Sequence, residues 1–252
     1  MIITLLQQDI VWGDPTANHK RTEEAILNAP ASDLYVLPEM WSTGFAPEPE
    51  TIAEKDGSSL RFMQQMAVRM NAAIAGSIAT EEDGKYYNRF YFVKPDGSEP
   101  EYYDKHHLFT YSGENLRYAA GNKRVIVEWR DVRFLLQVCY DLRFPIFARN
   151  EAEGPDAYDV VLYVASWPTS RRAPWDTLLR ARAIENQCYV CGVDRVGSDP
   201  VCEYNGGTAF IDAYGRTVAS CPDNEVCTIT GEINMEKLNA FRQKFPVLKD
   251  KD

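Results

Sequence analysis

The 252-residue sequence contains no apolar run approaching the ~20 residues that a membrane-spanning helix requires. Its first residues, Met1 to Asp9, lack the basic stretch of a signal peptide and turn polar after Leu6. They are typical of a first strand, and we therefore expect a cytoplasmic protein. No Pro-, Ser- or Gly-rich linker and no low-complexity tract divides the chain, which predicts one domain over residues 1–252.

Positive charge is scarce, because 27 Lys and Arg residues stand against 37 Asp and Glu residues, for a net charge of −10. This balance argues against a basic surface for nucleic acid or for an anionic membrane, and we expect neither as a partner. A small anionic substrate would need arginines placed locally to bind it.

Histidine is also rare, with three residues in the chain, and no second cysteine pair accompanies the motif Cys188-Tyr189-Val190-Cys191. Residues three apart on a strand point to opposite faces, so Cys188 and Cys191 cannot both bind one ion. We therefore expect no metal site here. In a chain of this length without an export signal, the six cysteines are expected to be reduced thiols.

Strand and helix patterns alternate through the first third of the chain, and hairpin patterns follow. Turn signals at Pro95-Asp96-Gly97, Arg130-Asp131 and Asp212–Gly215 each separate two strand-like runs. Short, fully apolar runs such as Leu34–Leu37 are typical of strands buried on both faces. The pattern predicts an α/β protein: a four-layer α-β-β-α sandwich of two mixed sheets with helices on the outer faces.

Cys139 follows the apolar run Val132 to Val138, where a strand should end. Pro145 suits the first turn of a helix, which we expect over residues 144–153. A thiol between a strand end and a helix start lies near unpaired backbone N–H groups, which favour the thiolate. The alternative is a buried structural thiol, the usual state of a free cysteine.

Two further reactive groups follow expected strands: Glu39 comes directly after Leu34–Pro38, and Lys105 after Tyr102–Asp104. Ligand sites in α/β folds gather at such strand ends, so an acid, an amine and a thiol can meet there. A Cys-His enzyme that uses His106 or His107 is the alternative, since imidazole is the usual base for a thiol. Solvated loop positions for Glu39 and Lys105 remain open on residue patterns alone.

Three segments, residues 38–45 (PEMWSTGF), 103–109 (YDKHHLF) and 138–145 (VCYDLRFP), resemble the signature segments of the nitrilase superfamily of carbon–nitrogen hydrolases, in the family's order. The likeness extends over essentially the whole chain. Residues 139–145 and the sequence Ala165-Ser166-Trp167-Pro168 are most similar to the omega-amidase branch. The family commonly forms dimers, so the resemblance implies a homodimer or higher homo-oligomer, with the tail of about 242–252 at a subunit interface.

The resemblance implies a catalytic triad of Glu39, Lys105 and Cys139. Glu39 would act as base, Cys139 as nucleophile, and Lys105 with the backbone N–H of Tyr140 would hold the oxyanion. It also implies a second catalytic glutamate, Glu114, for which an exposed loop acid is the alternative. No metal or organic cofactor is needed for such a reaction.

Substrate-binding positions are implied at Tyr140, Trp167, Phe45 and Phe109. Omega-amidases cleave the terminal amide of dicarboxylic acid monoamides such as 2-oxoglutaramate or 2-oxosuccinamate, so the other end of the substrate is a carboxylate. The candidates to bind it are Arg143, Arg171 and Arg172, with Arg171 favoured, although Arg143 could instead brace Asp141 or the Glu39 loop. Alternative functions are hydrolysis of another C–N substrate (an N-carbamoyl amine, an aliphatic amide or a nitrile) and a non-catalytic scaffold subunit.

Overall fold

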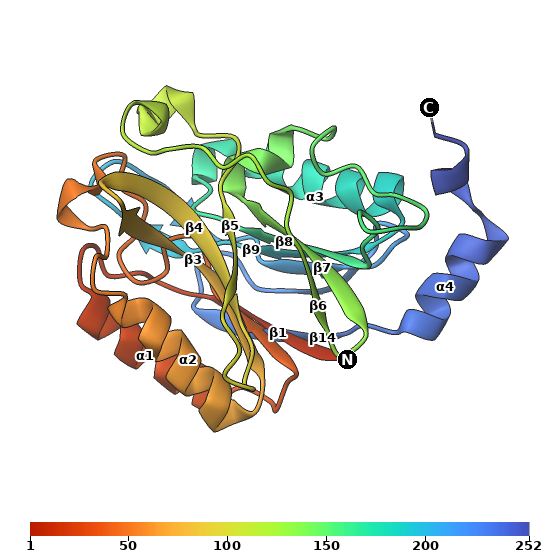
Figure 1. Cartoon of the computed structure of the whole chain (residues 1–252), viewed down its shortest axis with the longest axis horizontal. Coiled ribbons are helices and arrows are strands. Elements are labelled where there is room, and N and C mark those ends of the chain that lie inside the picture. The colour runs from red at the N-terminus through yellow and green to blue at the C-terminus, as the bar shows by residue number, and fades with distance from the viewer. Residues whose placement is uncertain (252) are drawn as a thin grey trace.

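The computed structural model describes residues 1–251, and Asp252, the last residue of the expected tail, lies outside them. Two six-stranded mixed sheets form the centre of the molecule (Figure 1). The first has the order β14 (Cys227–Glu232), β1 (Ile2–Gln7), β2 (Leu34–Val36), β3 (Ala73–Glu82), β4 (Lys85–Val93), β5 (Glu101–Asp104). The second has the order β13 (Thr217–Ser220), β12 (Ala209–Ile211), β9 (Tyr189–Val193), β8 (Val160–Val164), β7 (Val132–Val138), β6 (Ile126–Trp129). A small ribbon pairs β10 (Val196–Ser198) with β11 (Glu203–Asn205).

Helices cover the outer faces of both sheets. Helices α1 (Pro15–Asn28) and α2 (Ser58–Met70) lie on the first sheet, whereas α3 (Arg172–Asn186) lies on the second (Figure 1). Helix α4 (Met235–Lys244) extends from one end of the sandwich, near the C-terminus. The predicted four-layer α-β-β-α architecture is therefore confirmed. No helix within residues 1–251 is both long and apolar enough to cross a membrane.

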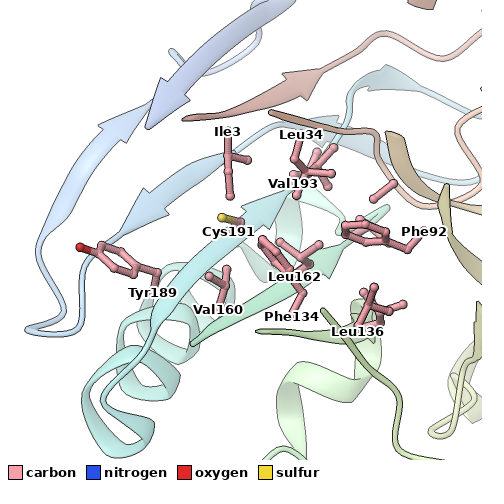
Figure 2. Close-up of a cluster of buried hydrophobic side chains, with 14 of the residues drawn as sticks. Ile3, Leu34, Phe92, Phe134, Leu136, Val160, Leu162, Tyr189, Cys191 and Val193 are labelled. Atoms are coloured by element: carbon pink, nitrogen blue, oxygen red, sulfur yellow. The ribbon is translucent and has the colours of Figure 1, made fainter. Parts of the chain in front are cut away.

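The main hydrophobic core lies between the two sheets. Ile3, Leu34 and Phe92 of the first sheet meet Phe134 and Leu162 of the second (Figure 2). Two further clusters fill the spaces between each sheet and its helices. The buried thiols Cys191 and Cys188 belong to different clusters on opposite faces of the second sheet, as the period of a strand requires.

Strand directions explain why reactive residues share one edge of each sheet. In the first sheet β2 and β3 are parallel, β4 reverses and β5 reverses again, so β2 and β5 end on the same side. In the second sheet β7, β8 and β9 are all parallel. The segments that follow these strands therefore emerge together at the seam between the sheets.

The helix expected over residues 144–153 is absent, which corrects the prediction. A five-residue 3-10 helix, Cys139–Arg143, comes directly after β7, and the chain then runs through turns. The Asp141 carboxylate accepts the backbone N–H of Val138, so the turn closes on the strand end. Phe144 is already extended, at φ −116° and ψ 90°, as a residue before proline prefers.

The C-terminal tail packs on its own chain as far as residue 251. Leu248 is buried, and the Lys251 ammonium donates a hydrogen bond to the Asn150 carbonyl. Phe245 stays 60% exposed. The place of this tail at a subunit interface remains a prediction.

A large-to-small change between the sheets tests this core. Leu162→Ala should lower the free energy of unfolding by about 2–5 kcal/mol, because it leaves a cavity in a close-packed interior. Urea denaturation monitored by circular dichroism measures the change. Leu116→Ala is the matched control, since Leu116 is 79% exposed, and its effect should stay within about 0.5 kcal/mol. Equal effects of the two variants would contradict the sandwich core.

Candidate active site

Glu39, Lys105 and Cys139 each follow a strand of the sandwich, after β2, β5 and β7 respectively. The backbone turns sharply beside two of them, because Met40 has φ 44° and Cys139 has φ 45°, in the left-handed region. Such conformations are strained for residues with side chains and concentrate at functional sites. The turn at Met40 is held by the Ser77 hydroxyl, which accepts the Met40 N–H at 2.9 Å.

A buried ion cluster lies at the seam between the sheets. The Lys105 ammonium donates to Oε1 of Glu39 at 3.0 Å and to both oxygens of Glu114, at 3.1 and 3.0 Å. All three side chains are essentially inaccessible to solvent. Glu114, which has an exposed loop position as its alternative in the sequence, therefore lies inside the site. Its Oε2 also accepts the backbone N–H of Phe109.

The Glu39 carboxylate is fixed from three directions. Besides Lys105, the Asn88 amide donates to Oε1 at 2.7 Å, and the backbone N–H of Ser166 donates to Oε2 at 2.8 Å. The Cys139 thiol lies close to the same carboxylate. The base and the ammonium are thus in contact, with the thiol beside them, as a proton transfer from Cys139 to Glu39 requires.

Electrostatics keep the thiol protonated at rest. Burial raises the pKa of the Cys139 thiol well above its usual range, the Glu39 charge adds to this effect, and Lys105 opposes it. The local N–H groups that favour a thiolate in the sequence are therefore opposed by burial and by the Glu39 charge. Burial alone would lower the pKa of the Lys105 ammonium, but Glu114 and Glu39 outweigh it and raise this pKa, so Lys105 stays charged. Burial raises the pKa of Glu114.

Both histidines beside Lys105 serve the framework. Nδ1 of His107 hydrogen-bonds Oδ1 of Asp141 at 2.8 Å, and the ring stacks on Phe144. His106 stacks on Phe147. Neither imidazole lines the cavity that contains Cys139. The arrangement therefore does not support the Cys-His alternative.

Asp141 connects the segments that carry Lys105 and Cys139. Its Oδ2 accepts the Tyr103 hydroxyl at 2.8 Å and the Val138 N–H at 2.9 Å, and its Oδ1 accepts the His107 N–H at 2.9 Å. Because Asp141 is fully buried, each of these bonds is shielded from water. One carboxylate thus ties the turn after β5 to the end of β7.

A cavity of about 480 Å³ opens from this cluster to the surface. Cys139 lines it together with most of the predicted substrate-binding positions: Phe45, Phe109, Tyr140, Arg143, Trp167 and Arg171. The backbone N–H of Tyr140 lies in the first turn of the 3-10 helix, where N–H groups lack partners within the helix. The outer wall adds Asp199, Val201 and Tyr204 from the β10–β11 ribbon, which the sequence did not indicate.

Two of the three candidate arginines lie in this cavity. The Arg143 guanidinium stacks on the Trp167 ring, at 5.0 Å from its centroid, and that of Arg171 stacks on Phe109 and Tyr111. Neither forms a hydrogen bond or ion pair with a side chain within residues 1–251, so the alternative of an Arg143–Asp141 brace is wrong. Arg172 pairs with Asp176 and Asp223 outside the cavity, and its candidacy is therefore wrong as well.

Asn88 and Ser166 are the contacts of Glu39 that the sequence did not assign. Ser166 belongs to the Ala165–Pro168 sequence, but its backbone N–H carries the interaction, and no side-chain pattern reveals that. Asn88 is an uncharged polar residue within the aromatic run of β4. A fully buried amide in such a run is the signal that could have marked it, since buried polar groups need partners.

An α-β-β-α sandwich with a carboxylate, an ammonium and a thiol at its strand ends defines a hydrolase of the nitrilase fold. The chain belongs to the carbon–nitrogen hydrolase family, whose model (Carbon-nitrogen hydrolase) matches residues 2–243. It is 44% identical to omega-amidase YafV of Escherichia coli (strain K12) over 99% of this chain and 96% of that one. It is 33% identical to the 2-oxoglutaramate amidase of Bacillus subtilis (strain 168) over 98% of this chain and 96% of that one. A CN-hydrolase superfamily protein from Xanthomonas campestris, solved with an arsenic adduct in its active site, superposes with a TM-score of 0.95 at 39% identity, covering 100% of this chain and 97% of that one.

Alkylation should single out Cys139 among the six thiols. With Glu39 nearby to accept its proton, Cys139 should react with iodoacetamide near neutral pH faster than the other five thiols, and Glu39→Gln should slow this reaction at least ~10-fold. Mass spectrometry of alkylated peptides measures each rate. Glu151→Gln, at the surface, is the control and should leave the rate unchanged. Uniformly slow labelling in the unmodified protein would contradict an activated thiol.

Proposed function

We propose that this protein is an omega-amidase, which hydrolyses the terminal amide of dicarboxylic acid monoamides of the 2-oxoglutaramate type and releases ammonia. The observation that carries the proposal is a contiguous Glu39–Lys105–Cys139 cluster in a cavity that also presents two arginines free of ion pairs within residues 1–251. The similarity to YafV and to the 2-oxoglutaramate amidase supports this substrate class.

Acylation begins with transfer of the Cys139 proton to Glu39. The sulfur then attacks the amide carbonyl, and the Lys105 ammonium and the Tyr140 backbone N–H stabilise the oxyanion. Glu39 returns the proton to the amide nitrogen, so that ammonia leaves and a thioester remains. Because Lys105 keeps its proton throughout, it acts as a fixed positive charge.

Deacylation repeats the sequence with water as the nucleophile. Glu39 takes a proton from water, the hydroxide adds to the thioester carbonyl, and the sulfur leaves as the carboxylic acid forms. The proton then returns from Glu39 to Cys139. Glu114 touches neither the sulfur nor the incoming water in this scheme; it holds Lys105 and the backbone of Phe109 in place.

The substrate carboxylate binds to the arginines of the cavity. A guanidinium pairs with a carboxylate through two parallel hydrogen bonds, and stacking on an aromatic ring leaves those donors free. Arg143 sits four residues after the nucleophile, beside Trp167, whereas Arg171 lies against Tyr111, which is 82% exposed at the outer end. We assign the bound carboxylate to Arg143 and its capture at the entrance to Arg171.

Cys139→Ala tests the nucleophile. Because no other group of the cluster can form the thioester, ammonia release from 2-oxoglutaramate should fall at least ~10³-fold, as measured by a coupled glutamate dehydrogenase assay. Cys227→Ala, a partly exposed thiol outside this cavity, should retain normal rates. Wild-type rates in a folded Cys139→Ala protein would disprove the assignment.

Substitution of the arginines tests the substrate class. Arg143→Ala and Arg171→Ala should each raise KM for 2-oxoglutaramate about 10-fold or more, while KM for a neutral aliphatic amide stays the same. Arg172→Ala is the matched control, since Arg172 adjoins Arg171 in sequence but pairs outside the cavity. Equal effects on anionic and neutral amides would remove the carboxylate role. A panel with nitriles and N-carbamoyl amines separates the other C–N substrates.

Self-association into a homodimer or higher oligomer, and residence in the cytoplasm, complete the proposal. Ile146 at 91% and Phe245 at 60% exposure are apolar side chains that a second copy could cover.

A further inference from the structure

Asn88 contacts both acids of the site although it lies on a strand beneath the cavity. It belongs to β4 and is fully buried. Its Nδ2 donates to Oε1 of Glu39 at 2.7 Å and to Oε1 of Glu114 at 3.3 Å. Its backbone carbonyl accepts the N–H of Lys105 at 3.0 Å. One residue therefore contacts both carboxylates of the cluster and the backbone of Lys105.

The charges of the cluster do not balance when both acids are ionised. Glu39 and Glu114 then carry two negative charges, and Lys105 supplies one positive charge to both. The other titratable groups nearby, Asp194 and Tyr118, are buried, and burial raises the pKa of each, which favours their neutral forms. Two buried carboxylates that share one cation tend to take up a proton, because like charges repel strongly away from water. A neutral donor shared by both carboxylates stabilises their ionised forms without adding a charge.

The orientation of the Asn88 amide leaves its carbonyl oxygen without a hydrogen bond in the described part of the chain. Its Oδ1 is buried and finds no hydrogen-bond partner within residues 1–251. Unpaired buried acceptors are unfavourable, and a buried asparagine can pair its carbonyl as well. Asn150 illustrates this, because its amide accepts two backbone N–H groups and donates to two carbonyls. The Asn88 amide thus donates to both carboxylates while its own carbonyl oxygen stays without a hydrogen bond within residues 1–251.

We propose that Asn88 is a positioning residue that keeps Glu39 ionised and aims it at Cys139, an inference that rests on the proposed function. Asn88 and Lys105 together occupy Oε1 of Glu39, while Oε2 accepts one backbone N–H, from Ser166. Oε2 thereby keeps a lone pair for the thiol proton. In the transfer, the S–H bond of Cys139 breaks, an O–H bond forms on Glu39, and the negative charge passes to sulfur.

Asn88→Ala and Asn88→Val test this role. Loss of the donor makes the ionised carboxylates of the cluster less stable, so the base is lost earlier on acidification. The acidic limb of the kcat/KM profile for 2-oxoglutaramate should move up by about one pH unit. The fall should reside in kcat, with KM nearly unchanged. Val supports the strand by its branched side chain, and so keeps the test open if Ala destabilises the fold.

The pH dependence of Cys139 alkylation provides a readout independent of the substrate. Its acidic limb should move with that of kcat/KM in both Asn88 variants. If 2-oxoglutaramate is not hydrolysed at all, the proposed substrate fails while alkylation still reports on Asn88. Asn150→Ala is the control for loss of a buried amide: it should reduce stability and leave both limbs in place. Asn88 variants that are folded, with acidic limbs identical to those of the unmodified protein, would overturn the inference.

Discussion

The interaction on which the site depends is the burial of the Lys105 ammonium between two carboxylates. An isolated ammonium in this position would lose its proton, because removing a charge from water is unfavourable. Glu39 and Glu114 reverse that tendency and raise the pKa of Lys105. The Lys105 ammonium in turn offsets the repulsion between the two carboxylates, so that both can lie within hydrogen-bond distance of its nitrogen. Removal of Lys105 would leave both buried carboxylates without a cation, whereas removal of either acid leaves Lys105 paired with the other one.

This dependence ties catalysis to closure of the sandwich. Glu39 and Lys105 follow strands of the first sheet, whereas Cys139 follows a strand of the second. Glu39, Lys105 and Cys139 therefore come together only after the two sheets have packed through their common core. Asp141, which bonds the Tyr103 hydroxyl of one sheet and the Val138 N–H of the other, fixes their relation next to the reacting atoms.

The sequence predicts those parts of the site that depend on local pattern. Glu39, Lys105 and Cys139 each follow an apolar strand, and strand direction brings such ends together. The predicted helix over residues 144–153 was wrong because the turn after β7 is held by Asp141, which accepts the Tyr103 hydroxyl and the His107 N–H. These are contacts between distant segments, and they outweigh the preference of Pro145 for a first helical turn. The layers and hairpins follow from apolar runs and turn residues, which are local signals.

Contacts that join distant segments cannot be predicted from local sequence patterns. Asn88 reads as one polar residue in an aromatic strand, and its partner Glu39 lies 49 positions away. The direction of the pKa shift of Cys139 does not follow from the local N–H groups either, because burial and the Glu39 charge raise this pKa. A pKa in a buried site depends on every charge within several ångströms, and this information is three-dimensional.

A protonated resting thiol fits the charge arrangement of the cluster. If Cys139 were a thiolate beside ionised Glu39 and Glu114, three negative charges would surround the single ammonium of Lys105. Internal transfer of the thiol proton to Glu39 instead keeps the total charge constant while the negative charge moves to sulfur and then to the oxyanion. The Glu39, Glu114 and Lys105 ions are thus removed from water once, when the protein folds. The proton transfers between Cys139 and Glu39 during a turnover do not bring a further charge out of water. Selective reactivity of Cys139 therefore arises from the neighbouring acceptor Glu39 rather than from a permanently ionised sulfur.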